Sequence, residues 1–342
     1  MPFLAGQANV ANTARRVSPL RHLWKVVQLL VTVTLIYWVV QKLDWHQVGT
    51  SVLTAKIGWL AVALVYPFLT IAIDALRWQV LLGAICRRVA WHKLFRVNLV
   101  GIFFDNFLPG NIGSDAYRTL SLSQQYAPRE VLATVVLGRV LSWFGLLMLG
   151  MVGLLALRDQ LPVDAFWSGL YVVGAMLCLT GIGFGLLTTY QRWNVYRGHK
   201  SILWRWKALA LFLQSVNQLL TTRTLIVCLG LSLLLHAVVI SASVVIAKAY
   251  GVLPEQLFFV ACAAPLGLIA AMLPISIAGH GVRETVFIYL LSNVGIMPEV
   301  AVVISISLYV VLALASLTGG ATRAFSEAKT LARGVDEGIA AQ

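Results

Sequence analysis

Two Pro/Gly-broken apolar segments of the sequence carry clusters of ionisable side chains. The first is VNLVGIFFDNFLPGNIGSDAYR (97–118), and the second contains LPISIAGHGVRE (273–284). Charge and irregular backbone are costly in hydrocarbon, so they persist there only where they face a protein interior or a water-filled cavity. Acids and arginines in such a place can hold a polar or anionic group. The predicted substrate-binding or translocation residues are Asp105, Asn106, Asp115, Arg118, Arg139, His280, Arg283 and Glu284.

Arg139 lies about one-third of the way along an apolar segment of valines and leucines. A lone arginine at that depth costs at least about 2.5 kcal/mol on insertion scales, so it must face a partner. Asp105, Asp115, a lipid phosphate or a backbone carbonyl are the candidate partners. Asp74 and Arg77 are three residues apart and share a helix face, which favours a supporting structural ion pair over a pair that lines a cavity.

The two broken segments share a skeleton of Leu-Pro, then glycines, then charged residues. In the first segment, Pro109 ends the preceding half helix, and Gly110 and Gly113 permit positive φ and a close backbone approach. Ser114 or Asp115 is expected to cap a helix that begins near Ala116. The predicted hinge or break residues are Pro109, Gly110, Gly113, Pro274, Gly279 and Gly281.

The composition is that of a polytopic helical membrane protein. The 342 residues are 59% hydrophobic and 11% charged, with a net charge of +13, and the mean hydropathy is +0.84. Most of the positive charge falls in short loops, which indicates orientation and contact with anionic lipid headgroups, not nucleic acid. The four cysteines show no CxxC spacing, and no Walker loop, GxGxxG, HExxH or GxSxG occurs, so no cofactor, metal or catalytic residue is predicted.

Hydropathy predicts six full spans and two re-entrant broken hairpins. The spans are 23–40, 57–82, 131–157, 166–187, 225–249 and 300–319. Basic loops place the N-terminus and the segments before the first hairpin and after residue 187 in the cytoplasm. The first hairpin (91–125) must then enter and leave on the cytoplasmic side, and the second (257–298) on the outer side.

This order of elements predicts an inverted-topology repeat with a site near the midplane. Half one covers 23–157 and half two covers 166–322, between a cytoplasmic tail at 1–22 and a C-terminal tail at 323–342. A basic amphipathic segment at 191–223 is expected to lie on the cytoplasmic interface or to pack on the bundle. Gly181, Gly183 and Gly185 are expected to allow close helix packing, and His236 to be a hydrogen-bonded packing residue.

The chain resembles the lysylphosphatidylglycerol-synthase transmembrane-domain family, also called flippase-like domain proteins. The matching segments are DALRWQVLL (74–82), NFLPGNIGSDAYR (106–118), the Arg139 segment and LPISIAGHGVRE, in family order over roughly 23–323. The resemblance implies a multi-pass protein of the bacterial inner membrane that moves a lipid between leaflets. The soluble aminoacyltransferase domain of long members does not follow here, so aminoacyl-lipid synthesis is not expected.

The sequence therefore favours a lipid transporter with no enzymatic activity. An anionic, glycosylated or isoprenoid lipid would pass its headgroup through a charged, hydrated cavity at the midplane. The alternative is a membrane glycosyltransferase that uses lipid-linked sugars, or an accessory protein of a lipid or hopanoid pathway. The expected partners are the lipid substrate and anionic headgroups at the basic loops, with lipid-biosynthesis enzymes or a homo-oligomer left open and nucleic acid excluded.

Overall fold

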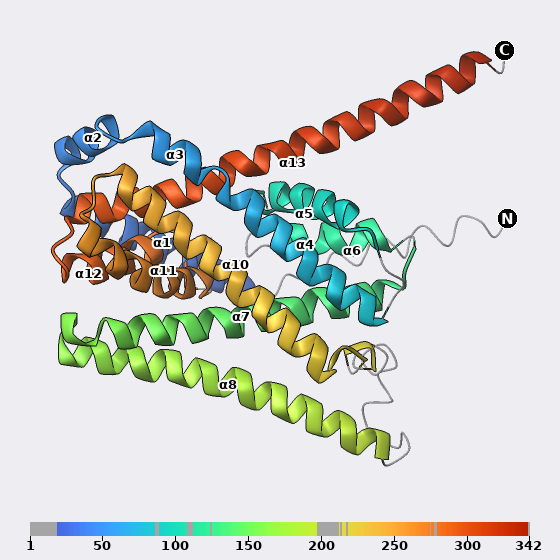
Figure 1. The fold of residues 1–342 in the computed structure, drawn as a ribbon, viewed down its shortest axis with the longest axis horizontal. Helices are drawn as coiled ribbons and strands as arrows, with labels where there is room; N and C mark the ends of the chain where they lie inside the picture. Colours follow the sequence, from blue (N-terminus) through green and yellow to red (C-terminus); the bar gives the residue numbers. More distant parts are fainter. Residues whose placement is uncertain are drawn as a thin grey trace.

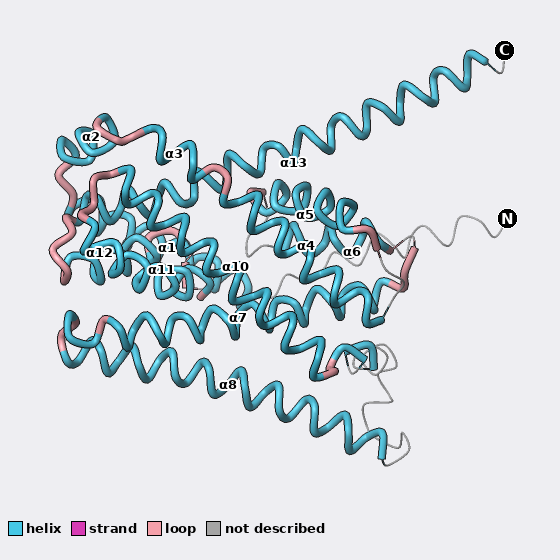
Figure 2. Tube along the Cα trace, in the orientation of Figure 1, coloured by secondary structure: helices cyan, strands magenta, loops and turns pink. Residues whose placement is uncertain are grey.

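The fold is a helical bundle (Figures 1 and 2). The computed structural model describes residues 19–85, 89–107, 112–123, 125–196, 212, 214–216, 218–273, 275–276 and 279–340. Every regular element in these ranges is helical. A chain this apolar must satisfy its backbone hydrogen bonds within each segment when it is embedded in lipid, and the α-helix does so.

Half one contains a bend, a short turn and a helical break. Its helices are α1 (Pro19–Lys42), α2 (Trp45–Leu53), α3 (Ile57–Ala63), α4 (Tyr66–Ile85), α5 (Trp91–Asp105), α6 (Ile112–Leu122) and α7 (Pro128–Ala156). α1 and α2 meet at a bend of 82°. α3 and α4 together form the second predicted span, and α5 and α6 are the two arms of the first hairpin.

Half two repeats the order of long helix, long helix, hairpin and long helix. Its elements are the 3-10 turn η2 (Arg158–Gln160), α8 (Val163–Tyr196), α10 (Thr222–Ala249), the 3-10 turn η4 (Pro254–Gln256), α11 (Leu257–Met272), α12 (Val282–Ser292) and α13 (Pro298–Ala340). α11 and α12 are the arms of the second hairpin.

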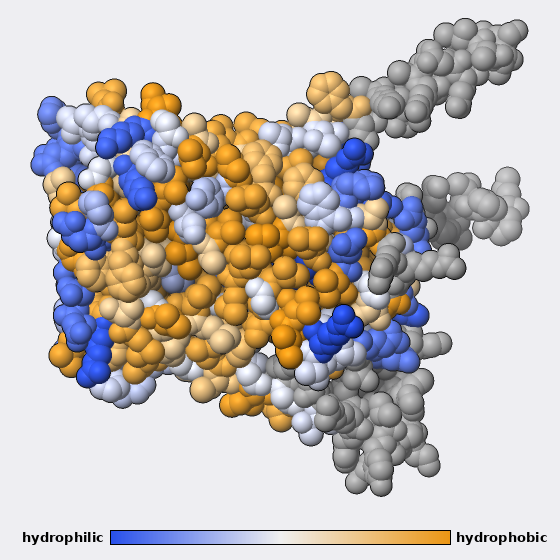
Figure 3. All heavy atoms as spheres, viewed as in Figure 1, coloured by the Kyte–Doolittle hydropathy of each residue, from blue (hydrophilic) through white to orange (hydrophobic). Residues whose placement is uncertain are grey.

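Six helices in the described ranges are long and apolar enough to cross a membrane, and a seventh qualifies if α1 and α2 are taken as one bent span. One of the six is Pro254–Met272, which the sequence assigned to a re-entrant hairpin. The surface in Figure 3 shows a broad apolar band between two polar ends. The chain is thus a multi-span helical membrane protein, as the composition predicts.

The two hairpins lie towards opposite ends of the bundle (Figure 1). Each one packs against the last helix of the other half: α5 contacts α13, and α11 contacts α7. The two second spans, α4 and α10, pack on each other. This exchange of partners is what an inverted repeat of two such halves produces. The first helices break the pattern, because α1 contacts α12 whereas α8 packs on α7.

Paired glycines bring each hairpin close to the helix that supports it. A Cβ atom at Gly319 would overlap the carbonyl oxygen of Leu99 on α5, and one at Gly153 would overlap that of Cys262 on α11. Small residues at such crossings let helix backbones approach in a bilayer, where apolar burial supplies little driving force between helices. The same device therefore fixes both hairpins.

Several expectations meet a different outcome. α6 begins at Ile112 and not near Ala116, so Asp115 lies in its first turn and does not precede it. α13 continues as a helix through 323–340, where the sequence indicated only a tail. No described atom lies within 4 Å of a Cβ built at Gly181 or Gly183, so neither glycine packs closely against the described residues.

The basic amphipathic segment falls mostly outside the described residues. Its described end packs on the bundle, because Val216 and Leu219 are buried against Leu81 of α4 and Leu137 of α7. Of the two expectations for this segment, packing on the bundle therefore holds for its last residues.

Gly319→Ala should destabilise the protein by about 1–3 kcal/mol, because the added methyl group meets the α5 backbone. Gly230→Ala on α10 is the matched control, since a Cβ there meets nothing within 4 Å. The two variants are purified in detergent and heated, and size-exclusion chromatography monitors their unfolding. The difference between their unfolding midpoints measures the loss of stability. Equal midpoints for the two variants would show that this helix crossing is looser than described.

Candidate functional site

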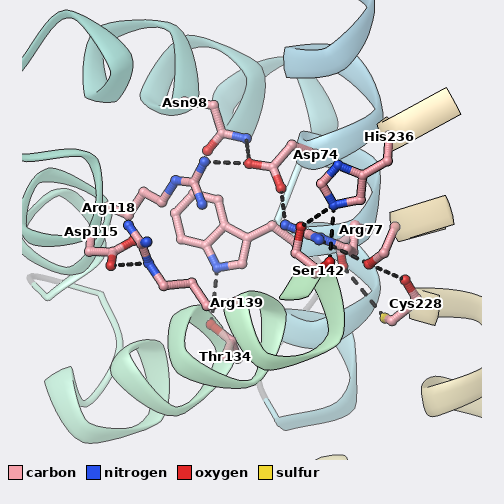
Figure 4. A network of polar contacts seen from close by, with 12 residues as sticks. Asp74, Arg77, Asn98, Asp115, Arg118, Thr134, Arg139, Ser142, Cys228 and His236 are labelled. Carbon is pink, nitrogen blue, oxygen red and sulfur yellow. Dashed lines mark hydrogen bonds and ion pairs between the residues drawn. The ribbon is translucent and has the colours of Figure 1, made fainter. Parts of the chain in front are cut away.

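Five ionisable residues from α4, α6 and α7 form a charge network inside the bundle. The charge network consists of Asp74, Arg77, Asp115, Arg118 and Arg139. Figure 4 shows these side chains turned towards one another around a central tryptophan ring, with further polar groups from α5 and α10 at the edge. The sequence proposed all five residues, the Asp74–Arg77 pair, and Asp115 as one of the candidate partners of Arg139. It did not propose the pairing of Asp74 with Arg118.

Asp74 is the centre of the charge network. Its carboxylate forms ion pairs with Arg77 on its own helix and with Arg118 on α6. Asn98 of α5 donates to Oδ2 of Asp74 over 3.2 Å, and Arg77 donates to Oγ of Ser232 on α10 over 3.0 Å. The Asp74–Arg77 pair expected as a separate support is therefore part of the site itself.

Trp78 positions Arg118 against α7. The Arg118 guanidinium carbon lies 5.5 Å from the centre of the Trp78 ring, and the indole Nε1 donates to Oγ1 of Thr134 over 3.0 Å. A cation over an indole face is stabilised by the ring quadrupole, most strongly where water is excluded. Nε of Arg118 is buried and has no hydrogen-bond partner among the described residues.

Arg139 pairs with Asp115, one of the four partners that the sequence allowed. This pair is the accessible part of the charge network. The side chains of Arg139 and Asp115 are 34% and 24% exposed, whereas those of Arg118 and Asp74 are 13% and 12% exposed. Oδ1 of Asp115 has no hydrogen-bond partner among the described residues.

The charge network lies deep in the bundle. Asp74 lies eleven residues before the last residue of α4, Ile85, and Arg139 lies eleven residues after the first residue of α7, Pro128. At 1.5 Å per residue both are about 16 Å from the helix ends. Both helices belong to segments long and apolar enough to cross a membrane, so the charge network lies well inside the spanning part of the bundle.

Asp105 and Asn106 stabilise the first hairpin, and in the described ranges no ion pair joins Asp105 to the charge network. The Asp105 carboxylate accepts a hydrogen bond of 2.8 Å from the backbone N–H of Ser114, and Asn106 donates to Oγ of Ser316 on α13 over 2.7 Å. Gly113 faces the end of α5, where a Cβ would be 2.5 Å from the carbonyl oxygen of Phe104. These contacts close the break between α5 and α6.

Arg283 and Glu284 form a second cluster at the other hairpin. Arg283 donates to Glu284 over 2.9 Å, and Oγ of Ser305 on α13 lies 3.0 Å from the same carboxylate oxygen. The other Glu284 oxygen accepts the backbone N–H of Gly281 over 2.8 Å and so caps α12. In the described ranges no hydrogen bond or ion pair links this cluster to the charge network, so the sequence-predicted set divides into two groups.

Two of the predicted break residues of the second hairpin, Gly279 and Gly281, have left-handed backbone conformations. Gly279 and Gly281 have φ values of +76° and +83°, which disfavour side chains larger than hydrogen. His280 packs edge-on against Tyr309, with ring centres 5.0 Å apart. Pro109, Gly110 and Pro274 lie outside the described residues.

Four site residues were not found from the sequence: Trp78, Asn98, Thr134 and Ser232. Only Asn98 gave a signal, because a carboxamide in an apolar helix needs a polar partner. His236 is held as expected, with Nε2 within 3.1 Å of Oγ of Ser142. Each of these polar side chains thus makes a hydrogen bond to a residue of another helix.

The comparisons with known proteins agree with the motifs. No curated protein matches the chain. The model of one protein family, described as the lysylphosphatidylglycerol synthase TM region, matches residues 25–317. This match covers both hairpins and every residue of the charge network, so the chain belongs to the lysylphosphatidylglycerol synthase transmembrane-region family, a family of lipid-related bacterial membrane proteins.

Proposed function

We propose that this protein moves an amphipathic lipid between the leaflets of a bacterial inner membrane, with its N-terminus in the cytoplasm. The headgroup passes the charge network while the acyl or isoprenoid tails stay in the bilayer. The lipid is anionic, or carries a phosphate or a phosphate-linked sugar. No ATP-binding motif occurs in this chain, so the movement runs down the lipid's own gradient or is coupled to an ion or proton gradient.

The observation that carries the proposal is the partly accessible Arg139–Asp115 pair inside a bundle of membrane-spanning helices. Burying such a pair stabilises a protein no more than apolar residues in the same positions would, because desolvation offsets most of the attraction between the charges. Intramembrane ionisable residues accordingly mark pathways for polar groups. The family match independently indicates a lipid-related protein.

The chemistry of the pair suits exchange between protein and substrate. The Asp115 carboxylate binds the Arg139 guanidinium when no lipid is present. A phosphate oxygen of the lipid can replace that carboxylate. Guanidinium binds carboxylate and phosphate with the same planar fork, so the exchange needs little rearrangement. Asp74 holds Arg77 and Arg118 behind the exchanging pair.

Arg139→Ala should lower the rate of lipid exchange by at least about tenfold, since one charge-assisted contact contributes about 1.5–3 kcal/mol. The measurement is dithionite quenching of labelled lipids in proteoliposomes. Arg129→Ala is the matched control, because it removes the same charge from the exposed first turn of α7. Exchange at the parental rate by Arg139→Ala, with normal insertion, would rule out the proposed role of Arg139.

Arg129 and Glu255 should be accessible from opposite sides of the membrane. Arg129 lies at the open end of the first hairpin and Glu255 at the start of the second, and both are exposed. With Cys86, Cys178, Cys228 and Cys262 replaced by serine, an impermeant maleimide applied to intact cells should label Glu255→Cys but not Arg129→Cys. Lysed cells, in which both sites react, are the control. Labelling of both from outside would contradict the opposed hairpins.

A further inference from the structure

We propose that a cavity on α3 binds an anionic phospholipid of the outer leaflet through Lys56 and Lys248. The cavity has a volume of about 370 Å³ and is lined by Lys56, Gly58, Trp59 and Val62. None of these residues belongs to the charge network, and the site does not depend on transport. The proposed function supplies only its side, because a cytoplasmic N-terminus places the end of α1, and α2 after it, at the outer surface.

α2 marks the level of the membrane interface beside the cavity. It meets α1 at a bend of 82°, so it runs along the membrane surface where α1 crosses the membrane. Trp45 and Leu53 of α2 and Ile57 of α3 are exposed. A helix that lies in the membrane plane buries such side chains between the headgroups and the upper acyl chains. α2 and the start of α3 lie at the same end of the bundle as α12 (Figure 1).

Two lysines from different helices converge on the cavity. The backbone N–H of Lys56 donates to the carbonyl oxygen of Ala249 over 2.9 Å. This contact joins the start of α3 to the end of α10, so Lys56 lies opposite the residue that follows Lys248. Nζ of Lys248 is 5.2 Å from the centre of the Trp59 ring. Two ammonium groups therefore flank one exposed indole.

The charge of these two lysines is not neutralised by an acid in the described ranges. All ion pairs there belong to the charge network or to the Arg283–Glu284 cluster. At the same end of the bundle, Asp44 caps α2 through the N–H of His46 over 2.9 Å, and Glu299 accepts the N–H of Asp44 over 3.1 Å. The cavity therefore has a positive potential, and its complement is an anion.

The apolar side chains next to the cavity indicate that the anion belongs to a lipid. Val62, Val65 and Leu69 follow Trp59 along α3 and α4, and all three are exposed. Lysine binds phosphate as a compact charge, and the acyl chains of the same molecule can lie along this apolar row. A free phosphate ion would contact the lysines and leave the row uncovered.

The Trp59 ring disfavours a choline headgroup. An indole face attracts a quaternary ammonium group, but Lys248 already lies over this ring. A bound choline would have to displace Lys248, and its positive charge would lie close to Lys56. A headgroup whose only charge is its phosphate meets neither obstacle. We therefore expect the site to prefer phosphatidylglycerol to phosphatidylcholine.

Photo-cross-linking to lipid tests the site without any transport step. The full chain is reconstituted in phosphatidylcholine vesicles with a trace of phosphatidylglycerol that carries a diazirine near the start of one acyl chain. Phosphatidylcholine with the same diazirine chain is the control probe. Mass spectrometry of peptides measures the yield on 57–69, divided by the yield on α8. This ratio should be about tenfold higher for the phosphatidylglycerol probe, which corresponds to about 1.4 kcal/mol.

Lys56→Gln/Lys248→Gln should abolish the preference, because it removes both charges. Lys42→Gln is the matched control, since Nζ of Lys42 lies 4.3 Å from the centre of the Trp38 ring but Lys42 does not line the cavity. Equal ratios for the two probes in the parental chain would overturn the proposal. So would a preference that persists in Lys56→Gln/Lys248→Gln, or one that Lys42→Gln removes equally.

Lys56→Arg/Lys248→Arg separates loss of charge from loss of structure. It should retain the preference, because both positive charges remain. Loss of the preference in this variant, with an unchanged size-exclusion profile, would show that the lysines shape the cavity and do not bind the lipid.

Arg139→Ala separates this site from the proposed function. Trp59 and Asp74 are 15 positions apart along α3 and α4, which is about 22 Å of helix. The variant should therefore lose lipid exchange and keep the cross-linking preference at 57–69. If the parental chain exchanges no lipid, a lysine-dependent preference still supports the site and refutes only translocation.

Discussion

The pairing of Asp74 with two arginines is the constraint on which the arrangement of half one depends. One carboxylate holds Arg77 of its own helix and Arg118 of α6, so it joins a full span to the returning arm of the first hairpin. Without it, two buried guanidinium groups would lose their counter-charge, at a cost of about 3–5 kcal/mol for a broken buried pair. The first hairpin can therefore carry a charged end into the middle of the bundle only because α4 presents this acid.

The second constraint is backbone proximity, and it acts on both halves alike. Gly319 supports α5 and Gly153 supports α11, each from the last helix of the other half. Packing of this kind fixes the two hairpins in equivalent positions but says nothing about their charges. The charges differ: Glu284 is fully engaged in capping α12 and binding Arg283, whereas Asp115 lies at the edge of a partly accessible network. The two hairpins thus share their packing, but the Arg283–Glu284 cluster is buried whereas the Arg139–Asp115 pair is partly accessible.

The sequence could predict the spans and the breaks, because hydropathy and the effects of proline and glycine on the backbone are local properties. Positive φ was expected at Gly110 and Gly113, but in the described residues of the two breaks it occurs at Gly279 and Gly281, whereas Gly113 lies within α6. The sequence also identified the charged residues, since each is costly where it lies. It could not predict that Asp74 pairs with Arg118, 44 positions away, because helix rotation in a bilayer is set by packing against neighbours. Helix packing also decides that the charged residues expected to line one cavity form two separate clusters. No feature of the sequence pointed to Trp78 or Ser232.

Asp115 supplies the counter-charge that an arginine inside a membrane-spanning bundle needs, and in the proposed function it does so while no substrate is bound. An unpaired guanidinium at that depth would draw in water or distort the bilayer, whereas a permanently buried pair would bind no lipid. Asp115 avoids both outcomes, because it neutralises Arg139 while 24% of its side chain remains exposed. Its unpartnered Oδ1 shows that the carboxylate is held by fewer contacts than that of Asp74. In the proposed function, the carboxylate that an incoming phosphate displaces is therefore Asp115, which has fewer contacts, whereas displacement of Asp74 would leave both Arg77 and Arg118 without their ion-pair partner.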